Sequence, residues 1–312
     1  MTHLKEKIIL YFTEQPLPQA ALQITARYVS GIQISPKEKK IKHHFVVPLD
    51  KGVVHPLFSG KNITNPLVLE KKIKEGWRNA FFSDKKIALL LPELSQKSYV
   101  LPFDSLPVSH QERARIIRFR IKKQMPLLPE DVRISFDLIR SNHRGKILAT
   151  IARKSVINEY EDFFSGLGLK IKTIGIPSLC LPHLLDTEKE KDSILLNIEK
   201  DFFSLGAVIN SNISLYRQKS FILGSQNQNS LNQKIESIIQ ELINTSNFIE
   251  DREKKKIESL WIRLGMIDSA DEMFTKLEER LSFLVKDIAS SIPYNLHLEE
   301  KRILSPLFGQ IL

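Results

Sequence analysis

Short β-type runs alternate with amphipathic helix patterns along most of the 312 residues, and this alternation limits the possible folds more than any other feature. Residues 87–91 and 194–198 are continuous apolar runs typical of buried strands, whereas Leu69, Ile73 and Trp77 recur at helical spacing. Alternating strands and helices predict an α/β or α+β protein.

In two segments the secondary structure is predicted from local sequence pattern alone. Residues 21–34 read as one or two strands broken at Ser30-Gly31, because glycine often marks a turn. Residues 272–288 are predicted to form one helix, because apolar side chains recur along a single stripe through this segment.

Composition is that of an ordinary globular protein, with 42% hydrophobic and 26% charged residues. Apolar runs reach about five residues, whereas a membrane-spanning helix needs ~20. The first 20 residues lack the apolar region of a signal peptide. Cys180 is the only cysteine, which excludes an intramolecular disulfide. We therefore expect a cytoplasmic protein.

The positive charge is concentrated in one segment. Residues 85–155 contain 15 Lys and Arg against 6 Asp and Glu, a balance of +9 out of the total of +10. Such a local excess indicates an anionic partner, although a solvated basic face without a partner gives the same pattern.

A basic helix is predicted at residues 109–124, ended by Met125-Pro126 because proline cannot continue a helix. Its cations are candidates for contact with an anionic surface: Arg113, Arg115, Arg118, Arg120, Lys122 and Lys123. A helix of this kind can lie on anionic lipid, hold an acidic peptide or contact phosphates. Nucleic acid is the weaker alternative, because Phe119 is the only aromatic residue placed to stack on bases.

The usual catalytic and metal-binding motifs are missing. The 12 glycines never form G-x-x-x-x-G-K-[ST] or G-x-G-x-x-G, and neither H-E-x-x-H nor G-x-S-x-G occurs. Cys180 and His183 supply two of the four ligands that a structural zinc needs. The sequence therefore predicts no metal site.

Two longer stretches show a family resemblance. Residues 85–139, from "KKIALLLPELSQKSYVLPF" to "PEDVRISFDLI", contain a strand ending in proline, a second strand, a helix, a proline turn and two acids. Residues 147–181 continue with strand, helix, "GLGL" and strand. This order, over about residues 20–290, resembles the type IV pilus assembly protein PilM family and the related cytoplasmic domain of the type II secretion protein GspL.

The resemblance implies an actin-like α/β fold of two ribonuclease H-like halves with a small inserted α+β subdomain. The implied domains are an N-terminal extension at 1–19, the first half of the core at 20–84, the inserted basic subdomain at 85–155, and the remainder with the second half at 156–312.

The resemblance also implies three nucleotide-contacting places, and the chain departs from the pattern at each. Actin-like ATPases need glycine hairpins, whose backbone N–H groups approach phosphate, and aspartates for the magnesium shell. The departures are Gln23 for Asp and Thr25 for Gly in the first hairpin, Asn197 for Asp and Glu199 for Gly in the second, and Gly265 alone from a glycine pair in the third. We expect no catalytic residue, no cofactor and no ATPase activity. An active ATPase with a divergent site, binding ATP and magnesium, is the alternative.

The function implied by the resemblance is a non-enzymatic scaffold, peripheral on the cytoplasmic face of the inner membrane, in a type IV pilus or type II secretion-like assembly platform. In the PilM family the cytoplasmic tail of a single-span membrane protein, PilN, docks in a groove beside the inserted subdomain. We expect Phe119, Met125, Pro126 and Leu127 to line the corresponding groove. A homodimer, and nucleic-acid binding through residues 85–155, remain open alternatives.

Overall fold

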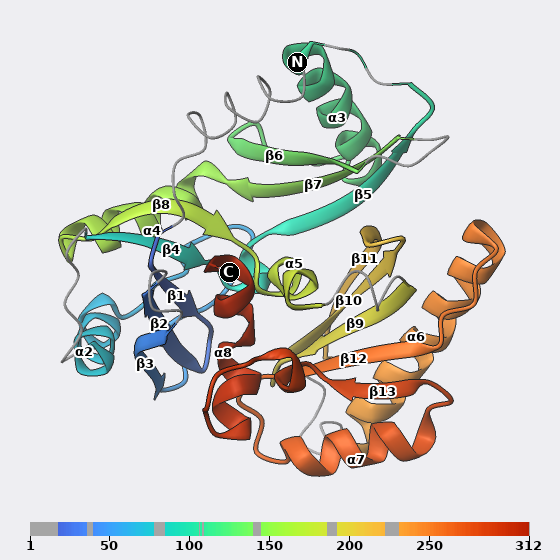
Figure 1. The fold of residues 1–312 in the computed structure, drawn as a ribbon. Coiled ribbons are helices and arrows are strands. Elements are labelled where there is room, and N and C mark those ends of the chain that lie inside the picture. The colour runs from blue at the N-terminus through green and yellow to red at the C-terminus, as the bar shows by residue number, and fades with distance from the viewer. Residues whose placement is uncertain are drawn as a thin grey trace, which may run out of the picture.

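The computed structural model describes residues 18–35, 40–77, 85–105, 107, 109–139, 145–185, 192–221 and 231–311. These residues form two five-stranded sheets and one three-stranded sheet, each covered by helices (Figure 1). In the described part of the chain no helix is long and apolar enough to cross a membrane.

The first core is built on the sheet β3-β2-β1-β4-β8. Its strands are β1 (Ala20–Ile24), β2 (Tyr28–Ser35), β3 (Lys40–Pro48), β4 (Lys86–Leu90) and β8 (Lys170–Gly175). β1 to β3 are antiparallel neighbours, whereas β4 and β8 run parallel to β1. All five residues of β1 are buried, because helices cover both faces of this sheet.

The helices of the first core lie on opposite faces of its sheet. Side chains of α2 (Pro66–Gly76) and α4 (Lys154–Gly166) pack on one face, and those of α8 (Leu298–Ile311) on the other. The short elements η1 (Glu93–Ser95), α5 (Pro177–Cys180) and η2 (Leu181–Leu184) complete this core. Asn65 caps α2, its side chain accepting the Val68 N–H at 3.3 Å.

The second core repeats this topology in the sheet β11-β10-β9-β12-β13. Its elements are β9 (Asp192–Ile198), β10 (Phe202–Ile209), β11 (Asn212–Ser220), α6 (Leu231–Glu253), β12 (Ser259–Leu264), α7 (Ala270–Arg280), β13 (Leu284–Asp287) and η3 (Ile288–Ser291). The order of antiparallel and parallel pairs matches that of the first sheet. Two α/β halves of one topology confirm the predicted fold class.

The insert is a three-stranded antiparallel sheet, β5-β7-β6, with one helix on one face. It comprises β5 (Lys97–Phe103), α3 (His110–Gln124), β6 (Val132–Ile139) and β7 (Gly145–Arg153). β4 lies in the sheet of the first core, so the insert begins at β5 and not at the expected residue 85.

The predicted break at Ser30-Gly31 is wrong. The chain turns at residues 25–27, and Gly31 lies within β2. A Cβ on Gly31 would overlap the Phe45 ring and lie 3.0 Å from Leu22. Glycine at this position therefore allows close packing of side chains and does not form a turn.

The predicted helix at 272–288 is half wrong, and α8 was not predicted. α7 ends at Arg280, and the following residues form β13 because this segment pairs in parallel with β12. The apolar stripe continues past the helix end, so periodicity alone could not locate it. α8 contains Pro306, a residue that argues against a helix from local pattern.

Candidate functional site: the cleft between the two cores

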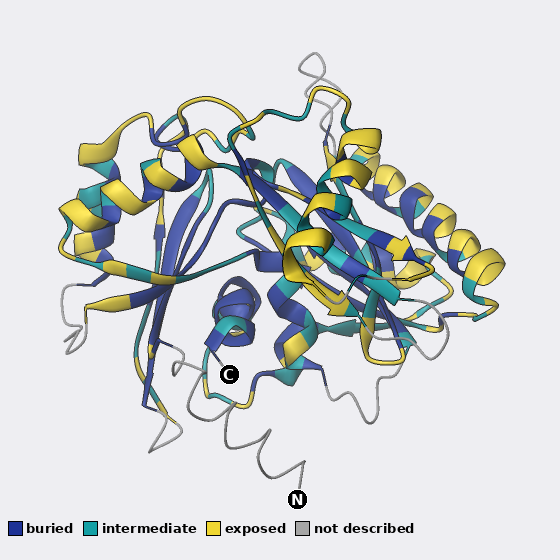
Figure 2. Ribbon diagram, turned by 90° about the horizontal axis from the view of Figure 1, so that it is seen from above, coloured by how far each residue is buried: buried dark blue, intermediate teal, exposed yellow. Residues whose placement is uncertain are grey.

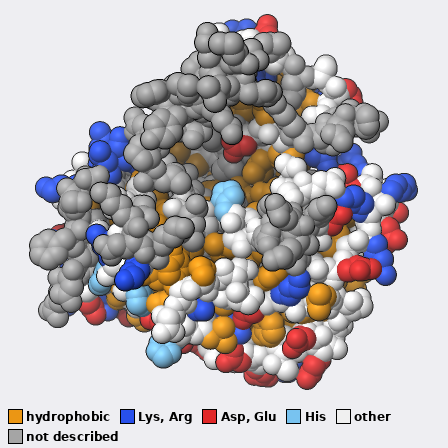
Figure 3. All heavy atoms as spheres, in the orientation of Figure 1, with side chains coloured by type: hydrophobic (Ala, Val, Ile, Leu, Met, Phe, Trp, Pro, Cys, Tyr) orange, Lys and Arg blue, Asp and Glu red, His pale blue; other side chains and the backbone are white. Residues whose placement is uncertain are grey.

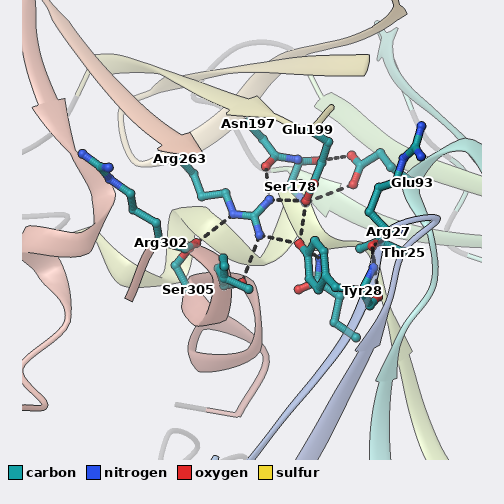
Figure 4. Close-up of polar contacts among 12 residues, drawn as sticks. Thr25, Arg27, Tyr28, Glu93, Ser178, Asn197, Glu199, Arg263, Arg302 and Ser305 are labelled. Atoms are coloured by element: carbon teal, nitrogen blue, oxygen red, sulfur yellow. Dashed lines mark hydrogen bonds and ion pairs between the residues drawn. The ribbon is translucent and has the colours of Figure 1, made fainter. Parts of the chain in front are cut away.

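Two equivalent hairpins, one from each core, face each other across an interdomain cleft (Figure 4). The turn at 25–27 joins β1 to β2, and the turn at 199–201 joins β9 to β10. These are the two turns in which the sequence predicts altered phosphate-binding hairpins. The side chains of the two turns, and the residues that contact them, decide what the cleft can hold.

Thr25 uses the backbone donors of the first turn. Its Oγ1 accepts the N–H groups of Arg27 at 3.1 Å and of Tyr28 at 3.0 Å. A phosphate-binding turn must keep such N–H groups free to point at the ligand. In the first turn these backbone N–H groups are therefore already used within the turn, by the Thr25 side chain.

Glu199 fills the space beside the third predicted place, Gly265. The Gly265 N–H donates to the Ile198 carbonyl at 2.8 Å, which holds the two segments together. A Cβ on Gly265 would lie 2.6 Å from Glu199 Oε1 and closer still to Oε2 and Cδ. The one glycine retained from the nucleotide pattern thus packs against a carboxylate.

Arg263 of β12 lies at the centre of the hydrogen-bonded cluster of Tyr28, Asn197 and Glu199 and is fully buried. Its Nη1 donates to Glu199 Oε1 and, at 3.0 Å, to Asn197 Oδ1. Its Nη2 donates to the Tyr28 hydroxyl at 2.8 Å and to a helix carbonyl of α8, and its Nε donates to another. All five N–H donors of the guanidinium are therefore used.

The two α8 carbonyls belong to Arg302 and Ile303, each 2.9 Å from an Arg263 nitrogen. Pro306 has no N–H, so the carbonyl four residues earlier, that of Arg302, lacks its usual helical donor. Arg263 and the Ser305 hydroxyl, at 2.8 Å, supply donors to it. Proline within the helix thus creates the acceptor that receives a buried arginine.

The tips of the hairpins are joined by an ion pair. Arg27 Nε and Nη2 donate to the Asp201 carboxylate at 3.1 and 3.0 Å, a bidentate contact between the two cores. The space left between the hairpins is about 30 Å³. This is room for roughly two water molecules, and not for a nucleotide.

The amides at the two expected aspartate positions belong to the same buried cluster. Gln23 Nε2 donates to the Tyr28 hydroxyl at 3.3 Å, and the Tyr28 hydroxyl donates to Glu199 Oε1 at 2.7 Å. Asn197 is 1% exposed and accepts from Arg263. Burial, opposed in part by Arg263, raises the pKa of Tyr28 well above its usual range, so it stays protonated.

A second buried acid links the cores beside this cluster. Glu93 of η1 accepts the hydroxyls of Ser178 in α5 and Tyr216 in β11. Burial raises the pKa of Glu93 above its ordinary value of 4.5, although both hydroxyls oppose the shift. The contacts to Ser178 and Tyr216 fix η1 between the two cores.

A large hollow lies beside the insert, on the face of its sheet opposite α3. This groove has a volume of about 1150 Å³. β6 and β7 form one wall, β8 another, and α5 and η2 the floor. In the view of Figure 3, hydrophobic side chains gather near the centre of the visible surface of the molecule, beside atoms of residues that are not described.

The four residues expected to line a partner groove do not line this large groove. Pro126 and Leu127 border a smaller hollow with Arg118 and Lys122, and Met125 packs into the core of the insert. Phe119 is 59% exposed on α3. None of the four lines the large groove, because they belong to the opposite side of the sheet.

Comparison with solved structures identifies the architecture. The chain superimposes on a PilM–PilN type IV pilus biogenesis complex with a TM-score of 0.73 and 14% identity, covering 95% of this chain and 97% of that one. It also matches a Bacteroides thetaiotaomicron protein of actin-like ATPase fold and unknown function, with a TM-score of 0.50, 11% identity, and 88% and 92% coverage. The chain has an actin-like fold.

A third match to this actin-like chain is the cytoplasmic domain of EpsL, an inner-membrane component of the Vibrio cholerae type II secretion system. The TM-score is 0.54 at 8% identity, with 93% of this chain and 94% of that one covered. No family model and no curated protein sequence matches the chain.

The residues of the actin-like cleft do not fit a magnesium nucleotide. Glu199 would set its carboxylate against the phosphates, where repulsion and desolvation both oppose binding. Gln23 and Asn197 present amides where the magnesium shell needs carboxylates. No group of three metal-binding side chains was found among the described residues.

The sequence located five of the cleft residues from the altered motifs, but it missed others that hold the cleft closed. Tyr28, Arg263 and the Arg302 carbonyl are far apart in sequence and follow no motif. Pro306 inside an apolar helix was the one available signal. It could indicate an unpaired carbonyl, but not its donor.

Proposed function

We propose that this chain is a non-enzymatic actin-like scaffold on the cytoplasmic side of an inner-membrane assembly platform for type IV pili or type II secretion. One observation supports this role most directly: the nucleotide cleft is closed by side chains, while a larger groove beside the insert is open. The PilM–PilN and EpsL likenesses support the choice of machinery.

The proposed partner is the cytoplasmic tail of a single-span membrane protein, bound in the large groove. β8 is the edge strand of the first sheet and β6 that of the insert. An extended tail can pair with the free backbone groups of an edge strand. Ile139, with Arg133 and Asp137 of opposite charge, offers apolar and charged contacts along β6 on the groove side of the sheet.

Tail binding is tested with a synthetic peptide of the N-terminal cytoplasmic segment of a single-span protein encoded beside this chain. Ile139→Asp and Ser135→Trp alter groove residues that are not buried, so both variants should fold normally. We expect either change to weaken binding in calorimetry by about tenfold or more, through lost apolar contact or steric block.

The matched control for the groove is Leu67→Asp. Leu67 is 76% exposed on α2, outside the groove, and its substitution should leave peptide affinity unchanged. Equal weakening by the control, or no binding at high micromolar peptide, would count against the proposal. A scrambled peptide of the same composition tests specificity.

An ATPase must bind nucleotide, so the expected absence of ATPase activity is tested by measuring the binding of a fluorescent ATP analogue. Because Thr25 occupies the turn's N–H groups and Glu199 fills the adjoining space, we expect no saturable, magnesium-dependent signal. Saturable binding that a chelator abolishes would instead support the active ATPase with a divergent site.

A further inference from the structure

α3 has an inner and an outer face of different chemistry. Ile117 and Ile121 are fully buried and pack on the sheet of the insert. Half a turn away, Arg115, Phe119 and Lys122 are exposed and lie on the face that points away from the sheet. α3 lies on the outside of the molecule, away from the second core (Figures 1 and 2).

Cations dominate the outer face. Arg115 and Lys122 have no ion-pair partner in the described part of the chain, and Lys123 lies over the Phe119 ring at 4.7 Å. Arg118 is held at one flank by the Glu130 carbonyl at 3.2 Å, and it borders the hollow that Lys122 also lines. The acids flanking the helix are Glu112, in its first turn, and Glu130 and Asp131, after its end; Asp131 pairs with Arg153 at 2.9 Å.

Two large apolar side chains project from the same end of the insert. Phe119 is 59% exposed, and Leu127, in the turn that follows α3, is 90% exposed. Leu127 shares its hollow with Arg118 and Lys122. Single exposed apolar residues are common on protein surfaces. Here two of them lie among several cations, so the surface is both basic and apolar. We call this set, Arg115, Arg118, Phe119, Lys122, Lys123 and Leu127, the basic apolar patch.

We propose that the basic apolar patch docks on an anionic lipid surface. The cations would lie at the headgroup phosphates, while Phe119 and Leu127 would enter the boundary between headgroups and acyl chains. Charge complementarity identifies the anionic partner, and the projecting side chains favour lipid over nucleic acid. A nucleic-acid surface needs aromatic side chains spaced for stacking, and Phe119 alone meets that need here.

Lipid docking and tail binding use opposite faces of the insert's sheet. α3 covers one face, and the groove lies on the other. A chain docked through α3 would thus keep its groove open to a tail that leaves the same membrane. The lipid proposal does not depend on the tail: lipid vesicles contain no protein, so either property can fail without the other.

The test is flotation of the full chain with vesicles of phosphatidylcholine, with and without phosphatidylglycerol. We expect binding only to the anionic vesicles, weakened by added salt. Arg115→Glu/Lys122→Glu should lower the apparent affinity about tenfold or more. Phe119→Ser/Leu127→Ser should weaken binding to anionic vesicles as well. At high salt, where charge is screened, this variant should lose the residual vesicle binding that the unaltered chain retains.

Matched controls are available on α2 and the loop before it. Lys61→Glu/Lys71→Glu makes the same charge change at exposed lysines outside the patch, and Leu67→Ser removes another exposed leucine. Both should bind like the unaltered chain. No binding to anionic vesicles at low salt, or equal loss in the controls, would overturn the proposal. Preference for duplex DNA over anionic vesicles in a competition would overturn it in favour of a nucleic-acid surface.

Discussion

Arg263→Met is expected to lower the free energy of unfolding by about 3–5 kcal/mol, because removing one member of a buried ion pair leaves the other without compensation. Methionine preserves most of the volume but none of the donors. Glu199 would keep a buried carboxylate, and two α8 carbonyls would lose a partner. Urea denaturation measures the change.

Arg280→Met is the control for Arg263→Met. Arg280 pairs with Glu236 at 2.7 Å, but the side chains are 42% and 62% exposed. Exposed pairs contribute about 0–1 kcal/mol, so this variant should be close to the unaltered chain. If the two variants lost similar amounts of stability, Arg263 would not hold the cleft closed.

Gly265→Ala is expected to destabilise the chain by about 3 kcal/mol, at the upper end of the usual cost of overpacking. The new methyl group would overlap the Glu199 carboxylate, which Arg263 and Tyr28 hold in place. In a Glu199→Ala background the overlap is gone, and the same substitution should cost under ~1 kcal/mol. This double-mutant cycle measures the coupling directly.

Gly206→Ala is the matched glycine control. Gly206 lies in β10, and a Cβ there would meet no atom within 4 Å. The substitution should change stability little. If Gly265→Ala lowered the free energy of unfolding by the same amount in the Glu199→Ala background, overlap with Glu199 would not be the cause. Glycine would then be needed at position 265 for its backbone conformation.

These contacts together describe how an actin-like cleft can stay closed without nucleotide. Arg263 supplies positive charge, and Glu199 and Tyr28 supply the oxygens around it, within a space that is closed to large ligands. A fully hydrogen-bonded buried pair of this kind fixes one arrangement of the two cores, although it adds less stability than its contact number suggests.

Much of the fold followed from the sequence. Buried strands such as β4 and β9 and the helices α2, α3 and α4 lie close to their predicted positions, because apolar periodicity reports local structure well. Predictions failed where distant pairing decided the outcome. β13 is a strand because β12 lies beside it, and Gly31 is within a strand because Phe45 packs over it.

The position of the expected partner-binding residues also depends on the tertiary structure. Phe119 and Leu127 are conspicuous in the sequence, and a basic helix ending in proline invites a binding role. Which side of the insert they occupy depends on how its sheet lies against the first core. The sheet turns one face to α3 and the other to β8, so these residues lie away from the large groove.

Sequence alone determined that the two hairpin turns depart from the phosphate-binding pattern, at Gln23, Thr25, Asn197 and Glu199. It also determined where the positive charge lies. Only the tertiary structure decided that the cleft is closed, because Arg263 meets Tyr28 across 235 residues of chain. Local pattern cannot specify such a contact: it arises from the packing of two cores and from the carbonyl of α8 that Pro306 leaves without a helical donor.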